Sequence, residues 1–112
     1  TDTELFLHGV SANRCILLAS SVLGFTVRVT GIASTTFEVI DLELKGTIKR
    51  DASNVTTLVG TVTSTVINNE LTGATAVLTA DDTNEALKLT VTGLSGKTIN
   101  WGAVGLLLDG RI

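Results

Sequence analysis

The side chains able to carry out chemistry are few in this 112-residue chain, and they form no catalytic pattern. His8 is the only histidine, and we interpret it as a loop residue. Serines and aspartates are present, but no Gly-x-Ser-x-Gly sequence surrounds a serine. Asp41 and Glu43 alternate along a strand pattern, which indicates a polar strand face and not a catalytic carboxylate pair. We therefore expect a protein that is not an enzyme.

Two further segments have the composition of binding motifs without their spacing. The sequence GLSGKT at residues 93–98 has Val91 where a phosphate-binding loop requires glycine, and a strand pattern follows it in place of a helix. Residues 81–84 (DDTN) carry oxygen ligands of the kind calcium prefers, but they lack the alternate spacing of a calcium loop. Both segments are predicted to be turns, the first of them a hairpin. No metal or cofactor is expected.

Composition limits the partners. The chain is 44% hydrophobic and only 17% charged, against about 25% in an average soluble domain, which indicates that it buries surface against copies of itself. Its net charge is −3, and the basic residues are scattered, so we expect no nucleic-acid binding. No apolar run approaches the roughly 20 residues of a membrane span. The single cysteine, Cys15, has apolar neighbours and is predicted to be a buried thiol.

The elements that must position any site are strands. Phe25, Val27 and Val29 alternate with polar residues, the period of a half-buried strand. The pattern changes phase near Val39 and Ile40, which predicts a β-bulge or a change of sheet there. Residues 15–22 have helical potential but fit better a short strand over 14–18 followed by a loop. Turn signals occur at residues 31–34, 51–54, 68–73, 81–84 and 93–97. Residues 1–112 therefore form one domain, an antiparallel β-sandwich, jelly-roll-like, of about eight strands.

The C-terminal strand pattern lacks alternation, so both of its faces should be out of water. One face would meet the core and the other a subunit. We interpret Trp101 as an aromatic residue of the core and not as a platform for a ligand. The candidate interface residues are Trp101, Val104, Leu106, Leu107 and Leu108.

Several segments together resemble a known family. They are TELFLHG at residues 3–9, GTIKRDA at 46–52, TLVG at 57–60, TADDTN at 79–84, and ALKLTVTG at 86–93 running into GKTINW at 96–101. In this order they resemble a module at the C-terminal end of tail-fibre-like virion proteins of tailed bacteriophages. The chain departs from that pattern at His8, at Asn100 and over its last residues. The resemblance implies a virion structural protein, made in the bacterial host cytoplasm, that probes a host surface or joins other virion proteins as a homotrimer.

Three functions remain open at this point. The first is a tail-fibre or head-fibre tip that self-associates and touches the host surface, of which a glycan is one candidate, through loops containing Ser34, Asp51, Asn54, Asn68 and Asn69. The second is a capsid decoration protein that cements the phage head. The third is a carbohydrate-binding sandwich that uses Trp101. A chain that begins at Thr1 fits either a clipped methionine or a piece of a longer protein.

Overall fold

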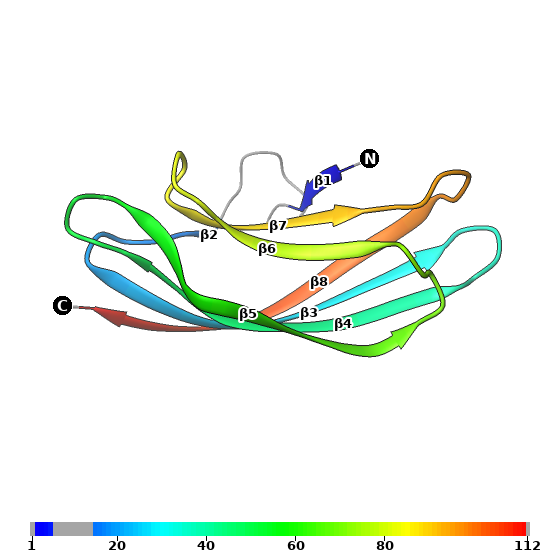
Figure 1. The fold of residues 1–112 in the computed structure, drawn as a ribbon, viewed down its shortest axis with the longest axis horizontal. Coiled ribbons are helices and arrows are strands. Elements are labelled where there is room, and N and C mark those ends of the chain that lie inside the picture. Colours follow the sequence, from blue (N-terminus) through cyan, green and yellow to red (C-terminus); the bar gives the residue numbers. More distant parts are fainter. Residues whose placement is uncertain (1, 6–14, 112) are drawn as a thin grey trace.

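The computed structural model describes residues 2–5 and 15–111, and the side chains of residues 3–4 and 16–105. Within these ranges every regular element is a strand. The strands are β1 (Asp2–Leu5), β2 (Cys15–Ile16), β3 (Ser21–Ala33), β4 (Val39–Arg50), β5 (Thr56–Asn69), β6 (Thr75–Asp81), β7 (Ala86–Thr92) and β8 (Ile99–Arg111). The predicted all-β sandwich is thereby confirmed, and Figure 1 shows its two layers. The described residues contain no helix long and apolar enough to cross a membrane.

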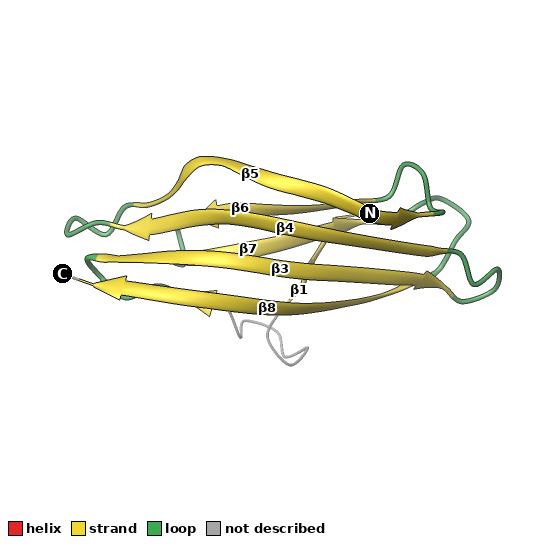
Figure 2. Ribbon diagram, turned by 90° about the horizontal axis from the view of Figure 1, so that it is seen from below, coloured by secondary structure: helices red, strands yellow, loops and turns green. Residues whose placement is uncertain are grey.

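One layer, the long sheet, has the strand order β5-β4-β3-β8, with every pair antiparallel (Figure 2). Its first three strands in sequence follow one another as hairpins, and the fourth returns from the other layer to lie beside β3. This path is a Greek key, the connection on which jelly rolls are also built. The long strands β3 and β8 stay in register from Ser21↔Arg111 to Ala33↔Ile99 without interruption.

The other layer, the short sheet, is centred on β7. One side of β7 pairs with β6, and the other pairs with β1 along Leu89–Thr92 and with β2 at Ala86 and Leu87. Strand β6 of the short sheet contacts β5 and β4 of the long sheet. Among the described strands β8 pairs with β3 alone, so it forms one long margin of the sandwich (Figure 2).

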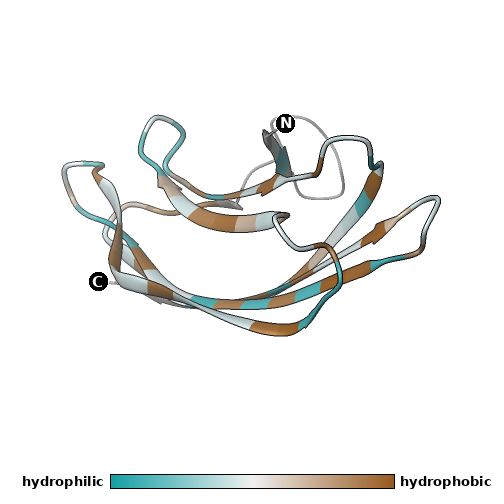
Figure 3. Ribbon diagram, turned by 45° about the vertical axis from the view of Figure 1, so that its right-hand side comes forward, coloured by the Kyte–Doolittle hydropathy of each residue, from teal (hydrophilic) through white to brown (hydrophobic). Residues whose placement is uncertain are grey.

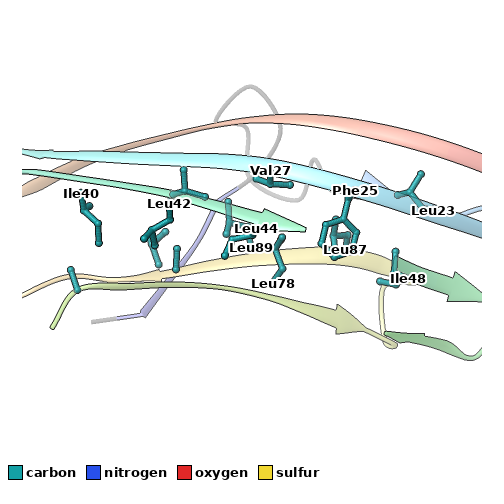
Figure 4. Packing of buried hydrophobic residues seen from close by; sticks show 14 of the residues in the cluster. Leu23, Phe25, Val27, Ile40, Leu42, Leu44, Ile48, Leu78, Leu87 and Leu89 are labelled. Carbon is teal, nitrogen blue, oxygen red and sulfur yellow. The ribbon is translucent and has the colours of Figure 1, made fainter. Parts of the chain in front are cut away.

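The core lies between the two sheets and follows the two-residue period of the strands. Odd-numbered residues of β3 and even-numbered residues of β4 point inward, and polar residues alternate with them on the outer face (Figure 3). Phe25, Leu44 and Ile48 from the long sheet pack toward Leu78 and Leu89 from the short sheet (Figure 4). The predicted strand over Phe25 and its neighbours is confirmed.

The change of phase near Val39 was predicted to mark a β-bulge or a change of sheet within one strand, and this explanation was wrong. Phe37 is not in a strand: it lies in the β3–β4 turn, and β4 begins at Val39 and keeps its phase throughout. The bulges are instead in β5, opposite the positions Asp41/Leu42 and Lys45/Thr47 of β4. At the second of them, residues 60–62 stand opposite Gly46 alone, and Gly60 takes a left-handed φ of 71°.

Three predicted turns lie differently in the structure. Residues 31–33 belong to β3, because Gly31 carries no side chain and lets the strand run on beneath the ring of Trp101; only Ser34 of that segment is in the turn. Asn68 and Asn69 end β5, and the turn follows them. Residues 93–98 are not a hairpin but a connection between the sheets, since β7 and β8 lie in different layers. The turns at 51–54 and 81–84 are confirmed. Among the described residues, the short strand predicted over 14–18 is present only at Cys15–Ile16, and the loop predicted to include Ser20, Ser21 and Gly24 ends at Ser20, because β3 already begins at Ser21.

Candidate recognition and assembly surfaces

Three connections meet at one end of the sandwich: residues 34–38, 70–73 and 93–98 (Figure 1, right). The Ser34 amide donates to the Thr98 carbonyl at 2.9 Å, and the Lys97 ammonium pairs with Glu38. We call this group of connections the loop end. Three of the candidate recognition residues, Ser34, Asn68 and Asn69, lie in or beside it. The Asn69 side chain accepts a hydrogen bond from the Leu71 amide, so that it shapes its turn.

Asp51 and Asn54 lie at the opposite end, where they shape their own turn. The Asp51 carboxylate accepts from the Ser53 and Val55 amides at 2.9 Å each. Asn54, at φ 62°, accepts from Arg50 Nη2 at 2.9 Å. These hydrogen bonds fix the shape of the turn, which is exposed. A recognition role for Asp51 and Asn54 stays a prediction.

Arg50 is the centre of a partly buried network at this end. Its Nη1 donates to the Leu17 carbonyl at 2.6 Å, and its buried Nε lies 3.6 Å from Glu85 Oε2. The other Glu85 oxygen accepts from the buried Thr56 hydroxyl at 2.9 Å, and the Thr56 amide donates to Asp82 at 2.7 Å. The network joins the end of β4, the start of β5 and the β6–β7 turn. No sequence motif predicts this network, because the residues that form it are far apart along the chain.

The carboxylates considered for chemistry are all engaged with neighbours in the fold. Asp81 accepts from the amide and side chain of Asn84, which closes the β6–β7 turn. Arg28 binds both oxygens of Asp41 at 2.6 and 2.7 Å, and these hydrogen bonds lower the Asp41 pKa. Glu43 pairs with Lys45 on the same outer face. Within residues 2–5 and 15–111 no three potential metal-binding side chains come together.

At the loop end, the pKa of Glu38 is lowered by a hydrogen bond from Lys97 and a second one from Thr36. Glu38 therefore stays charged beside Lys97 at neutral pH, and the two charges offset each other. Thr36 and Glu38 come from the β3–β4 turn and Lys97 from the connection between sheets. The ion pair thus joins two of the three connections.

A cavity of about 500 Å³ opens beneath the connection 93–98. Trp101 and Ile99 line it from β8, Val91 from β7 and Thr3 from β1, together with Gly93, Leu94, Ser95 and Lys97 of the connection. Trp101 is partly buried and packs against the core cluster. It is therefore an aromatic residue at the edge of the core, but it also faces a cavity. A second, shallower depression of about 400 Å³ lies on the outer face over the β5 bulge and includes Lys45 and several threonines.

The edge of β8 is an uncharged open margin of the long sheet. Among the described strands, β8 pairs with β3 alone, and no charged residue occurs from 99 to 108. Val104 is 77% exposed and stands opposite Arg28 on the outer face. The expectation that one face of the run 104–108 is covered by the core was wrong at Gly105, which is exposed, as is the neighbouring Ala103. The backbone of Leu106, Leu107 and Leu108 continues the pairing with β3, and their side chains lie outside the described residues.

No family model, curated protein or solved structure matches this chain. Two predictions fall outside the described residues: His8 as a loop residue and the buried thiol of Cys15. Arg14, the first residue of the predicted strand 14–18, falls there too.

Phe37 is a site that the sequence prediction missed. It sits in the loop end with a left-handed φ of 58° and an exposure of 69%. A bulky residue in that backbone region is strained, and exposing an aromatic ring forgoes the stabilisation of burying it. The alternation with Val39 concealed it, because it placed Phe37 in a strand. Phe37 therefore places an exposed apolar ring at the tip of the β3–β4 turn.

Replacing Phe37 with asparagine should raise the free energy of unfolding by about 0.5–1 kcal/mol, because asparagine tolerates the left-handed region better. Thermal unfolding followed by circular dichroism measures the change. Phe37→Ala is the matched control, since it removes the ring and keeps a strained Cβ. A fall in stability for Phe37→Asn equal to that for Phe37→Ala would show that the ring is held by contacts and that backbone strain is negligible.

Proposed function

We propose that this protein is a non-enzymatic structural module of a bacteriophage virion surface that self-associates through β8 and presents the loop end outward. The resemblance of residues 3–9, 46–60 and 79–101 to tail-fibre-like modules supports the virion assignment. A single sandwich with long uninterrupted strands is a suitable body for such a module. In this role the protein is made in the host cytoplasm and incorporated into the particle.

The observation that carries self-association is the contrast between the two edges of the long sheet. The β5 edge is interrupted by two bulges, which twist its backbone away from regular pairing. The β8 edge has no bulge and no charge from residue 99 to 108. Natural proteins protect the open edges of their sheets with bulges or charged residues. Because the described part of the β8 edge has neither, we expect it to be covered in the assembly.

A second copy of the chain is the occupant we propose for this edge. The margin is uncharged and apolar, and the chain as a whole is rich in apolar residues, which suits contact between identical surfaces. The resemblance favours three copies around a threefold axis. Backbone pairing of two β8 strands across a twofold axis would instead give a dimer, so the measured mass distinguishes the two.

Val104→Glu tests the proposal. The mass measured by light scattering should be three times 11.6 kDa for the wild type and 11.6 kDa for the variant. The variant should stay monomeric because association would bury the charge of the new glutamate. Glutamate at this position faces Arg28, so the fold should tolerate it. Val66→Glu is the matched control, since Val66 is a 58% exposed valine on the other edge strand. A monomeric wild type at all concentrations, or equal effects of the two substitutions, would refute assembly through β8.

The position in the virion is tested separately by the intact mass of the protein isolated from particles. A mass near 11.6 kDa would assign it to capsid decoration, where a free-standing product cements neighbouring capsomers. A much larger mass would assign it to the end of a fibre chain. Absence of the protein from purified particles would refute the virion assignment altogether.

A further inference from the structure

The cavity at the loop end has both apolar and polar lining residues. We call its apolar lining, which includes Trp101 and Ile99 of β8 and the almost fully buried Val91 of β7, the floor. We call its polar lining, which includes Thr3 and Ser95, the rim. This division of apolar and polar surface matches a ligand that is itself apolar on one face and hydroxylated at its edges.

The charge of the rim is balanced. Among the described residues that line the cavity, Lys97 is the only charged one, and its ammonium group is paired with Glu38. A site without net charge does not select an acid or a base. An ammonium beside a carboxylate does offer both donors and acceptors, which is what hydroxyl groups require because each one donates and accepts.

The aromatic floor is held in place by its neighbours. Trp101 stands opposite Gly31 in the β3–β8 register, and a Cβ at Gly31 would lie 3.1 Å from Trp101 Cε3. The ring therefore lies close against the β3 backbone, in a position that any larger residue at 31 would disturb. A ring held before binding loses little conformational freedom when a ligand stacks on it.

We infer that this cavity binds a neutral saccharide of one or two pyranose rings. Its volume of about 500 Å³ falls within the range of small-molecule sites. The apolar face of a pyranose would lie against Trp101, and its hydroxyl groups would meet Thr3, Ser95 and the Lys97–Glu38 pair. The inference does not rest on self-association, because the residues lining the cavity come from one chain.

Intrinsic fluorescence provides a direct assay, since Trp101 is the only tryptophan and the chain contains no tyrosine. The full chain is titrated with glucose, galactose, mannose, N-acetylglucosamine, maltose and lactose. At least one of these sugars should cause a saturable change in emission, with a dissociation constant in the millimolar range. Calorimetry then measures the same sugar with Lys97→Ala and Trp101→Phe, and each variant should bind about tenfold more weakly.

Lys45→Ala is the control, because Lys45 lines the depression on the outer face and not this cavity; it should bind like the wild type. The inference is overturned if no sugar of the panel gives a saturable change, or if both cavity variants bind with wild-type affinity. The monomeric Val104→Glu variant should keep the per-site affinity of the wild type. Failure of self-association and failure of sugar binding are therefore distinguishable.

Discussion

Replacing Arg50 with alanine is expected to lower the free energy of unfolding by about 3 kcal/mol, near the lower end of the cost of breaking a buried ion pair. The side chains of Arg50 and Glu85 are only 20% and 16% exposed. The substitution also removes the hydrogen bonds that Arg50 donates to the Leu17 carbonyl and to the Asn54 side chain. Glu85 would remain partly buried, with the Thr56 hydroxyl as its remaining donor. Urea titration followed by circular dichroism gives the free energy.

Arg28→Ala is the matched comparison, since Arg28 is likewise an arginine paired with a carboxylate. It binds Asp41 through two nitrogen atoms, but its side chain is 48% exposed. Water and salt screen that pair, so its loss should change stability far less. In 1 M salt the effect of Arg28→Ala should shrink further while that of Arg50→Ala persists. Equal effects of the two substitutions would mean that the network around Arg50 adds nothing beyond a surface ion pair.

Gly46→Ala is expected to cost about 2 kcal/mol through overpacking. A Cβ at Gly46 would lie 2.7 Å from Phe25 Cζ, and Phe25 is buried in the core, where its ring has little room to move. The glycine stands opposite the wider bulge of β5, so that the Phe25 ring lies over the β4 backbone where pairing with β5 is interrupted. Thermal unfolding measures the loss.

Two variants define the cause of that loss. Gly102→Ala should be tolerated, because its Cβ would lie 3.7 Å from Thr30 Oγ1, an ordinary contact. Combining Gly46→Ala with Phe25→Leu should cost less than the sum of the two single changes, since a shorter side chain makes room for the new methyl group. Strict additivity would show that the glycine matters for its backbone and not for the space it leaves.

The sandwich was predictable because strand alternation is a local property. Because Phe25, Val27 and Val29 alternate with polar neighbours, the sequence predicts that they share a buried face. The structure places all three in the core. The positions of most turns were predictable, but which sheet the strand after a turn joins was not. Residues 93–98 look like a hairpin, yet whether the next strand stays in the same sheet depends on where the whole core lies.

The candidate surfaces were only partly predictable, for a related reason. Val104 was identified because an apolar run without alternation is visible in the sequence. The role of Lys97 in the cavity was not, because it depends on Glu38, which is 59 residues away along the chain. The hydrogen bonds of Asp51 and Asn54 within their own turn were not predictable, because a polar side chain in a sequence does not reveal whether its partner is solvent, a ligand or its own turn.

The uninterrupted pairing of β3 with both β4 and β8 also governs how the chain folds. β3 reaches β4 across a short turn, so this hairpin can close early, whereas β8 must return from the far end of the sequence. Until it does, β3 is an open edge in a newly made chain, and it carries half of the core of the long sheet. The yield of native protein is therefore set by a late event, the docking of the C-terminal strand, in competition with intermolecular pairing of β3 between unfinished chains.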